Sequence, residues 1–163
     1  MTNNDCLRRL RYIFDCDDTK MIALFALAEQ KVTREQISGW LKRDEDPELE
    51  ECSDVLFATF MNGLIVDTRG KKPGPQPPPE TRLNNNIIFR KLKIALNLQA
   101  EEILEMLASI DVVISKHELS AFFRRPGHKH YRECKDQLLR NFLKSMQLKY
   151  RDDDEGSNES VWG

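Results

Sequence analysis

The sequence has no uninterrupted apolar run near the roughly 18 residues that a membrane-spanning helix needs, so we expect no membrane partner. Its first residues, Met-Thr-Asn-Asn-Asp, lack the basic start and the apolar stretch of a secretory signal. The four cysteines include no Cys-x-x-Cys pair, and this spacing favours reduced core thiols over a disulfide framework. Together these absences predict a cytoplasmic protein.

The common signatures of catalysis are also missing. Asp54 and Asp136 are the two acids most open to a catalytic interpretation, yet neither has a His or Ser at the spacing of a catalytic triad. No glycine-rich loop and no carboxylate pair accompanies them. We therefore expect no enzyme activity, no cofactor and no small-molecule substrate.

The sequence does contain one stretch that occurs twice. Asn3-Asn4 and the helix-like segment after it recur as Asn85-Asn86, 82 positions later and without a gap. The same offset relates further identical residues in the two copies, namely Ala26 and Ala108, Ser38 and Ser120, Arg43 and Arg125, Cys52 and Cys134, Asp54 and Asp136, and Phe60 and Phe142. Self-similarity at one fixed offset indicates a duplicated module.

Each copy carries the start signals of four helices. The asparagine pairs can cap the first helix, and Thr33 and Ser115 begin capping boxes for the third. The Asp46-Pro47-Glu48 segment favours a fourth helix from there to about Ile65. Its counterpart is expected to run from about His130 to Leu148. We predict an all-α protein of two four-helix modules, packed face to face.

Prolines and glycines separate the two copies. Residues 70–82 are rich in both, so they cannot continue a helix and should form an extended linker. The predicted first module is residues 1–69 and the second is residues 83–151. Residues 152–163 are acidic and rich in Ser, Asn and Gly, which predicts a disordered tail.

The net charge of −2 hides a partition between these segments. Residues 1–69 carry a net charge of −5 and residues 83–151 a net charge of +6. The linker adds +2, and the tail adds −5. Such asymmetry predicts either a polyanion site on the second module or attraction between the modules.

The repeated motifs resemble a family of bacterial proteins, the YehS-like proteins with the domain of unknown function 1456. The motifs are Asn-Asn-x3-Arg-x-Leu at residues 3–10 and 85–92, with Glu118-Leu119-Ser120-Ala121-Phe122-Phe123-Arg124 and residues 136–143 in the second copy. The resemblance covers both copies up to Arg151. It implies no agreed activity, catalytic residue or cofactor.

A nucleic-acid face on the second module is the first candidate site. Residues 90–125 have the order of the helices in phage-repressor-type DNA-binding domains, with 114–124 in the position of the recognition helix. Clustered Lys and Arg suit phosphates. The candidate residues are Arg90, Lys91, Lys93, Arg124, Arg125, Lys129 and Arg132. The alternative interpretation is a helical bundle with a solvated basic surface.

Two histidines and a cysteine form a second candidate. His128, His130 and Cys134 lie within seven residues, and Asp136 could add a fourth metal ligand. Cys134 corresponds to the apolar-face Cys52, however, and His128 fits a turn at the start of a helix. We therefore interpret this segment as part of a basic patch, with no metal site.

The repeated acids form the third candidate, and its interpretation is structural. We expect Asp54 and Asp136 each to pair with an arginine of its own module: Arg8 or Arg43 in the first, Arg90 or Arg125 in the second. The sequence thus favours a regulatory or adaptor protein whose second module binds nucleic acid. The alternative is a protein-interaction module, such as a homodimer, that uses the aromatic and basic surface of the third helix.

Overall fold

The computed structural model describes residues 1–151, and every regular element in that part of the chain is an α-helix. The first module holds α1 (Asn3–Ile13), α2 (Asp18–Leu27), α3 (Arg34–Leu41) and α4 (Asp54–Arg69). The second holds α5 (Asn85–Ala95), α6 (Ala100–Ala108), α7 (Lys116–Ala121) and α8 (Asp136–Arg151). The predicted all-α class and duplicated helix order are confirmed. The predicted tail, 152–163, lies outside the described residues.

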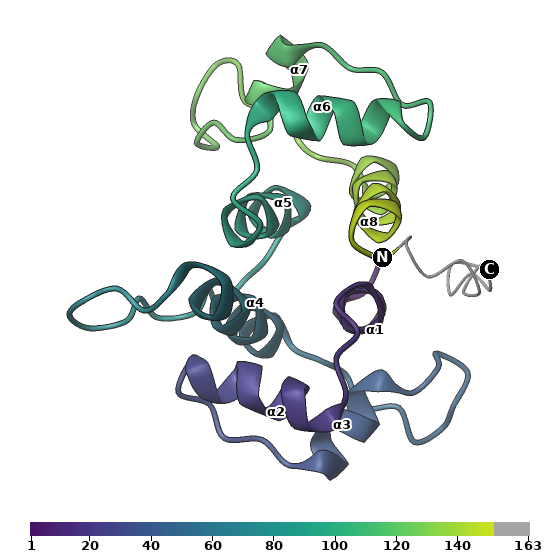
Figure 1. Ribbon diagram of the computed structural model, residues 1–163, viewed down its shortest axis with the longest axis vertical. Helices are drawn as coiled ribbons and strands as arrows, with labels where there is room; N and C mark the ends of the chain where they lie inside the picture. The colour runs from purple at the N-terminus through teal and green to yellow at the C-terminus, as the bar shows by residue number, and fades with distance from the viewer. Residues whose placement is uncertain (152–163) are drawn as a thin grey trace.

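The first and fourth helices of both modules form the centre of the molecule. Figure 1 shows α1, α4, α5 and α8 between an outer pair α2 and α3 and an outer pair α6 and α7. Within each module the second helix packs on the fourth, and between the modules α4 packs on α5 and α1 on α8. The interface therefore repeats itself, because α5 corresponds to α1 and α8 to α4.

Aromatic side chains fill the interior of each module. Phe25, Phe57 and Phe60 are fully buried in the first, and Phe89 and Phe142 in the second. Burying one such side chain contributes about 1.5–3 kcal/mol. The four cysteines are free thiols buried in this core, as predicted, and burial raises the pKa of the thiols of Cys6, Cys52 and Cys134 to about 12.

The turns that follow the first and second helices also repeat. Asp15 and Asn97 adopt left-handed conformations with φ of 52° and 53°, and Glu29 and Asp111 do so with φ of 63° and 64°. Each of these pairs is separated by the same 82 positions as the sequence repeat. The duplication therefore preserves the turns that end the first and second helices as well as the helices.

The starts of the first and fourth helices differ from the prediction in both modules. Thr2 and Asn84 cap α1 and α5, so the caps lie one residue before the asparagine pairs. The fourth helices begin at Asp54 and Asp136, well after the predicted starts at Asp46 and His130. In both modules the chain before the fourth helix is irregular, because side chains of the first helix hold its backbone groups, as described below.

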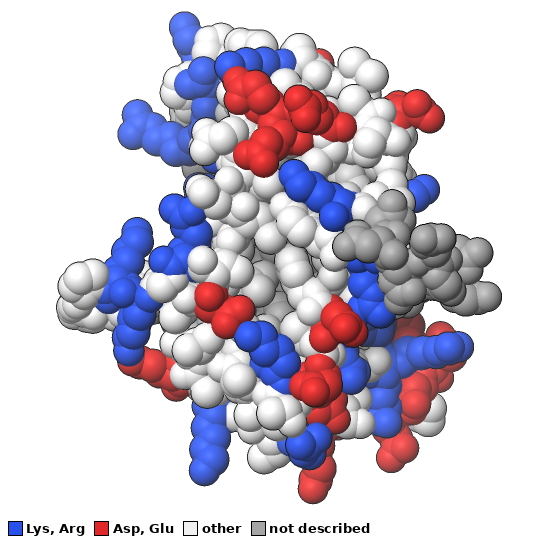
Figure 2. Space-filling model, viewed as in Figure 1, with Lys and Arg blue, Asp and Glu red and all other residues white. Residues whose placement is uncertain are grey.

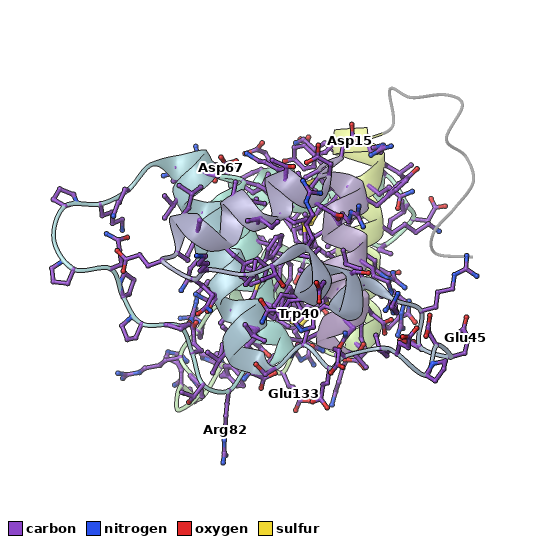
Figure 3. The ribbon with its side chains drawn as sticks, turned by 90° about the horizontal axis from the view of Figure 1, so that it is seen from below. Asp15, Trp40, Glu45, Asp67, Arg82 and Glu133 are labelled. Carbon is purple, nitrogen blue, oxygen red and sulfur yellow. The ribbon has the colours of Figure 1, made fainter. Side chains whose placement is uncertain are left out.

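The linker, residues 70–82, forms a loop between the two modules. Figure 3 shows the linker as a loop with proline rings that projects away from the helices, and Arg82 at its end extends outward. The C-terminal end of the linker is attached to the helices, because Glu80 pairs with Lys91 and the backbone N–H of the following residue, Leu83, donates to Asp54.

In residues 1–151, no helix combines the length and the apolar character needed to cross a bilayer.

Candidate nucleic-acid interface

One buried asparagine positions the loop that carries most of the candidate cations. The Asn86 side chain, 6% exposed, donates to the carbonyl oxygens of Phe122 and Arg132 at 3.0 and 2.8 Å. Its oxygen accepts from the Cys134 backbone N–H at 2.9 Å. The α7–α8 loop, residues 122–135, is thus fastened to α5 at its beginning and its end.

The first module repeats this arrangement. Asn4 donates to the carbonyl oxygens of Trp40 and Glu50 at 2.9 and 2.8 Å, and it accepts from the Cys52 N–H at 3.0 Å. Buried backbone groups need such partners when they are outside a helix. The second asparagine of each pair therefore explains why residues 42–53 and 122–135 form irregular loops instead of early turns of the fourth helix.

The predicted pairing of the repeated acids with arginine is wrong. Asp54 accepts from the Asn3 side chain at 2.7 Å, and Asp136 accepts from Asn85 at the same distance. The hydrogen bond from Asn85, with the nearby nitrogen of Met1, lowers the pKa of the Asp136 carboxyl below its ordinary value. Three arginines of that prediction lie elsewhere: Arg8 pairs with Asp5 and Asp44, and Arg43 and Arg125 are exposed.

These acids also join the modules to each other. The Met1 nitrogen donates to Asp136 at 2.8 Å, and the Leu83 backbone N–H donates to Asp54 at 2.9 Å. Leu83 follows Met1 by the repeat offset, so each module offers the chain before its first helix to the acid of the other. The repeated aspartates are therefore structural groups at a symmetric interface.

Lys91 does not belong to the predicted basic face. Its side chain is only 11% exposed, and its Nζ lies 2.6 Å from Asn62 Oδ1 on α4 and 3.0 Å from Glu80 in the linker. A lysine held between the modules cannot meet an external ligand. The prediction that Lys91 contacts nucleic acid is therefore wrong.

The other six candidates remain at the surface, and we call them the basic face. They are Arg90, Lys93, Arg124, Arg125, Lys129 and Arg132. Figure 2 shows blue side chains along the edge of the molecule near α7 and the loop that follows it, whereas red side chains gather over the position of α6. The positive charge of the second module is therefore concentrated around α7 and the α7–α8 loop.

Carboxylates pair with three arginines of the first module, and the positions of these carboxylates hold no acid in the second. Arg8 pairs with Asp5 and Asp44, and Asp18 pairs with both Arg11 and Arg34. The corresponding residues of the second module, at the repeat offset, are Ile87, Pro126 and Ala100.

The basic face has lost most of its acidic partners as a result. Among the ion pairs within residues 1–151, only Arg132 of this face has a carboxylate, Glu118 at 3.6 Å. Both side chains of that pair are largely exposed, so water weakens the attraction. Within residues 1–151, the other five cations of the face therefore form no ion pair with a carboxylate.

The resemblance to repressor-type DNA-binding helices is limited. Helix α7 has 6 residues, and residues 109–115 separate it from α6, whereas a helix-turn-helix uses a turn of about three or four residues. Phe122 is 7% exposed, and Phe123 packs edge-on against Phe89 with ring centroids 4.9 Å apart. The six residues of α7 include one lysine, Lys116, and both phenylalanines follow the end of the helix.

The histidine segment forms a cluster at the border of the basic face. The ring of His130 lies 5.9 Å from that of His117 and 5.5 Å from that of His128, measured between centroids. Cys134 is 1% exposed and faces the core, away from an external ion. In the part of the chain that the structure describes, no group of three or more His, Cys, Asp or Glu side chains could hold a metal ion.

Sequence reasoning missed two contributors to this surface. The first is Asn86, whose fastening of the α7–α8 loop could have been suspected from the recurrence of both asparagines. The second is Lys116, which lines a groove together with Lys93 and Arg124. An alignment of the two copies would have shown that Lys116 stands at the position of Arg34, whose partner Asp18 is replaced by Ala100.

Comparisons with known proteins agree with the duplication. A family model described as "Protein of unknown function (DUF1456)" matches the chain twice, over residues 3–70 and 85–152. The "Uncharacterized protein YehS" of Escherichia coli (strain K12) is 40% identical over 147 residues, which cover 90% of this chain and 94% of that protein. No solved structure is significantly similar to the chain.

Proposed function

We propose that this chain, which belongs to the DUF1456 family of proteins of unknown function, is a regulatory or adaptor protein without enzyme activity that binds nucleic acid through the basic face of its second module. One observation carries the proposal. The acids that neutralise Arg8, Arg11 and Arg34 in the first module are replaced by uncharged residues in the second, whose own cations are kept.

The chemistry of the face suits phosphates. Arg124 and Arg125 begin a loop whose backbone Asn86 fixes at both ends, so these cations need little further ordering before they bind. Lys and Arg that neutralise phosphates release condensed counterions, and this release drives most of the sequence-independent affinity for nucleic acid.

The contacts between the modules argue against the alternative in which the basic face serves to attract the first module. The cations that link the modules include the Met1 nitrogen, which meets Asp136, Lys91, which meets Asn62 and Glu80, and Arg151, which meets Asp15 at 3.1 Å. Four of the six residues of the basic face lie on the α7–α8 loop, and Figure 1 shows this loop and α7 on the side of the second module away from the first. Attraction between the modules therefore leaves the face available.

The second candidate function is a protein-interaction module without a nucleic-acid role. Its predicted contact surface relied on the aromatic residues of the third helix. Phe122 is buried, and Phe123 is half-buried against Phe89, so of these two rings only Phe123 offers part of its surface to a partner. An acidic partner protein remains an outcome that the experiment distinguishes.

The test compares matched substitutions in the two modules. Arg124→Gln/Arg125→Gln removes two charges from the basic face, and Lys42→Gln/Arg43→Gln removes two from the equivalent positions of the first module. We expect the first pair to weaken binding of a labelled oligonucleotide about ten-fold at moderate salt, and the second pair to have little effect. Equal affinities of the parent and both variants, measured by fluorescence anisotropy, would contradict the proposal.

A further inference from the structure

Two surface grooves occupy equivalent places in the two modules, between the start of the second helix and the third helix. Four pairs of equivalent positions line both of them: Asp18 and Ala100, Arg34 and Lys116, Ser38 and Ser120, and Lys42 and Arg124. Both grooves lie against the second and third helices of their module, although α7 ends two residues earlier in the repeat than α3 does. The residues of the first groove therefore indicate which charged groups the equivalent positions of the second groove can accommodate.

The first groove contains its own anion. Asp18 Oδ1 lies 3.3 Å from the Arg11 guanidinium, and Oδ2 lies 3.7 Å from that of Arg34. Asp18 is in the first turn of α2, where the exposed N–H groups favour negative charge. Glu35, Glu48 and Glu50 also line this groove, so a further anion would be repelled.

The second groove keeps the cations and lacks the anion. Lys93 and Lys116 stand at the positions of Arg11 and Arg34, Arg124 adds a third cation, and Ala100 replaces Asp18. Within residues 1–151, no acid lines the groove of about 310 Å³. In this described part of the chain the buried Nε of Arg124 has no hydrogen-bond partner, and Lys116 pairs with Glu101 alone, at 2.8 Å, where both side chains are well exposed.

An apolar wall faces these cations. Ala100, Leu119 and Phe123 form it, and the Phe123 ring is held against Phe89 while the Lys93 Nζ lies 5.6 Å from the ring centroid. The volume is near the lower end of ligand pockets, about 300 Å³, which suits one nucleotide-sized unit. The groove thus combines an anion position with a surface for a flat apolar group.

We infer that this groove binds one phosphate of an unpaired nucleic-acid strand, with the adjacent base against Phe123 and Leu119. The inference rests on the proposed function and names the kind of nucleic acid. Phosphate replaces the carboxylate that Asp18 supplies in the first module, and aromatic side chains accept any base by stacking. A duplex keeps its bases paired and stacked, so the groove selects single strands.

The decisive variant restores the missing acid. Ala100→Asp copies Asp18 into the second groove, and Asn97→Asp copies Asp15 into the same module with the same change of charge but outside the groove. Both acids occupy these positions in the first module without disturbing the fold. Anisotropy of a labelled 12-nucleotide strand and of its duplex, with adenosine monophosphate as a competitor, measures the ligand preference.

We expect the parent to bind the single strand at least ten-fold more tightly than the duplex. Ala100→Asp should lose at least ten-fold in this affinity, whereas Asn97→Asp should stay within about two-fold of the parent. Phe123→Leu copies Leu41 from the first module and should weaken strand binding several-fold without changing its dependence on salt. Urea unfolding of each variant establishes that it is folded.

The results that would contradict the inference distinguish a failure of the groove assignment from a failure of the proposed function. If the parent binds single strands but Ala100→Asp and Asn97→Asp behave alike, the groove is not the site, and the proposed function stands. If the parent binds no strand and no duplex, the proposed function fails and the inference with it. If adenosine monophosphate occupies the groove and strands do not displace it, the ligand is a free nucleotide and the assignment to strands is overturned.

Discussion

Replacing Asn86 by Ala tests whether one side chain holds the candidate interface in place. The substitution removes three hydrogen bonds of 2.8–3.0 Å and leaves two carbonyl oxygens and one N–H without their partner. A buried group left unsatisfied costs about 1–3 kcal/mol, and water entering the vacated space recovers part of this. We expect Asn86→Ala to lower the free energy of unfolding by about 3–4 kcal/mol.

Urea denaturation gives this quantity directly. With an m-value of about 2 kcal/mol/M for a chain of this size, the midpoint should fall by roughly 1.5–2 M. Asn4→Ala removes the equivalent bonds in the first module and should cost a similar amount. Asn84→Ala, which removes only a helix cap, should cost about 1 kcal/mol. An Asn86→Ala midpoint within about 0.3 M of the parent would refute the reasoning.

Asn86→Ala and Asn4→Ala should differ in oligonucleotide binding, although both should lower the free energy of unfolding by similar amounts. Asn86 fixes the loop that carries Arg124, Arg125, Lys129 and Arg132, whereas Asn4 fixes a loop that ends in acidic residues. At a temperature where both variants are folded, only Asn86→Ala should weaken oligonucleotide binding. Equal affinities would mean that the fastened loop is not part of the interface.

Three further predictions concern packing, thiols and the tail. A Cβ at Gly63 would lie 1.8 Å from the carbonyl oxygen of Leu24, so Gly63→Ala should destabilise by about 1–3 kcal/mol in thermal melts, whereas Gly127→Ala, in open space, should be near neutral. The native thiols, whose pKa is raised to about 12 at Cys6, Cys52 and Cys134, should react with a thiol reagent at pH 8 far more slowly than in urea, and fast native labelling would contradict their burial. Truncation after Arg151 removes a net charge of −5 and should tighten oligonucleotide binding, because those acids compete with phosphates; unchanged affinity in anisotropy would exclude this competition.

The parts of the fold that depend on local chemistry could be predicted from the sequence. Capping boxes at Thr33 and Ser115 act within one helical turn, so the starts of α3 and α7 are where the pattern places them. The fixed offset between copies then extended each local signal to the other module. Asp46-Pro47 is also a helix-start signal, but no helix begins there, because contacts that a local pattern does not contain hold this segment in another conformation.

Those contacts join residues far apart in the chain. Asn4 reaches Trp40, Glu50 and Cys52, and the backbone groups held in this way cannot enter a helix. Lys91 shows the same limitation at the candidate site. Helical spacing placed it beside Arg90 and Lys93, but the packing of α5 on α4, which periodicity does not specify, buried it against Asn62.

The loss of acids from the second module could have been found in the sequence alone. Aligning the copies sets Asp5 against Ile87, Asp18 against Ala100 and Asp44 against Pro126. The structure adds the reason why these positions matter, since each acid contacts an arginine in the first module. The comparison between modules therefore locates the candidate site more sharply than the total charge does.

The salt dependence of binding to a single strand tests the central claim most directly. If the basic face neutralises three to five phosphates, a plot of log affinity against log salt for the intact protein should have a slope of about −2 to −3.5. Arg124→Gln/Arg125→Gln should make this slope less negative by about 1.4, and Lys42→Gln/Arg43→Gln should leave it unchanged. No binding at low ionic strength, or an affinity that does not change with salt, would contradict the account.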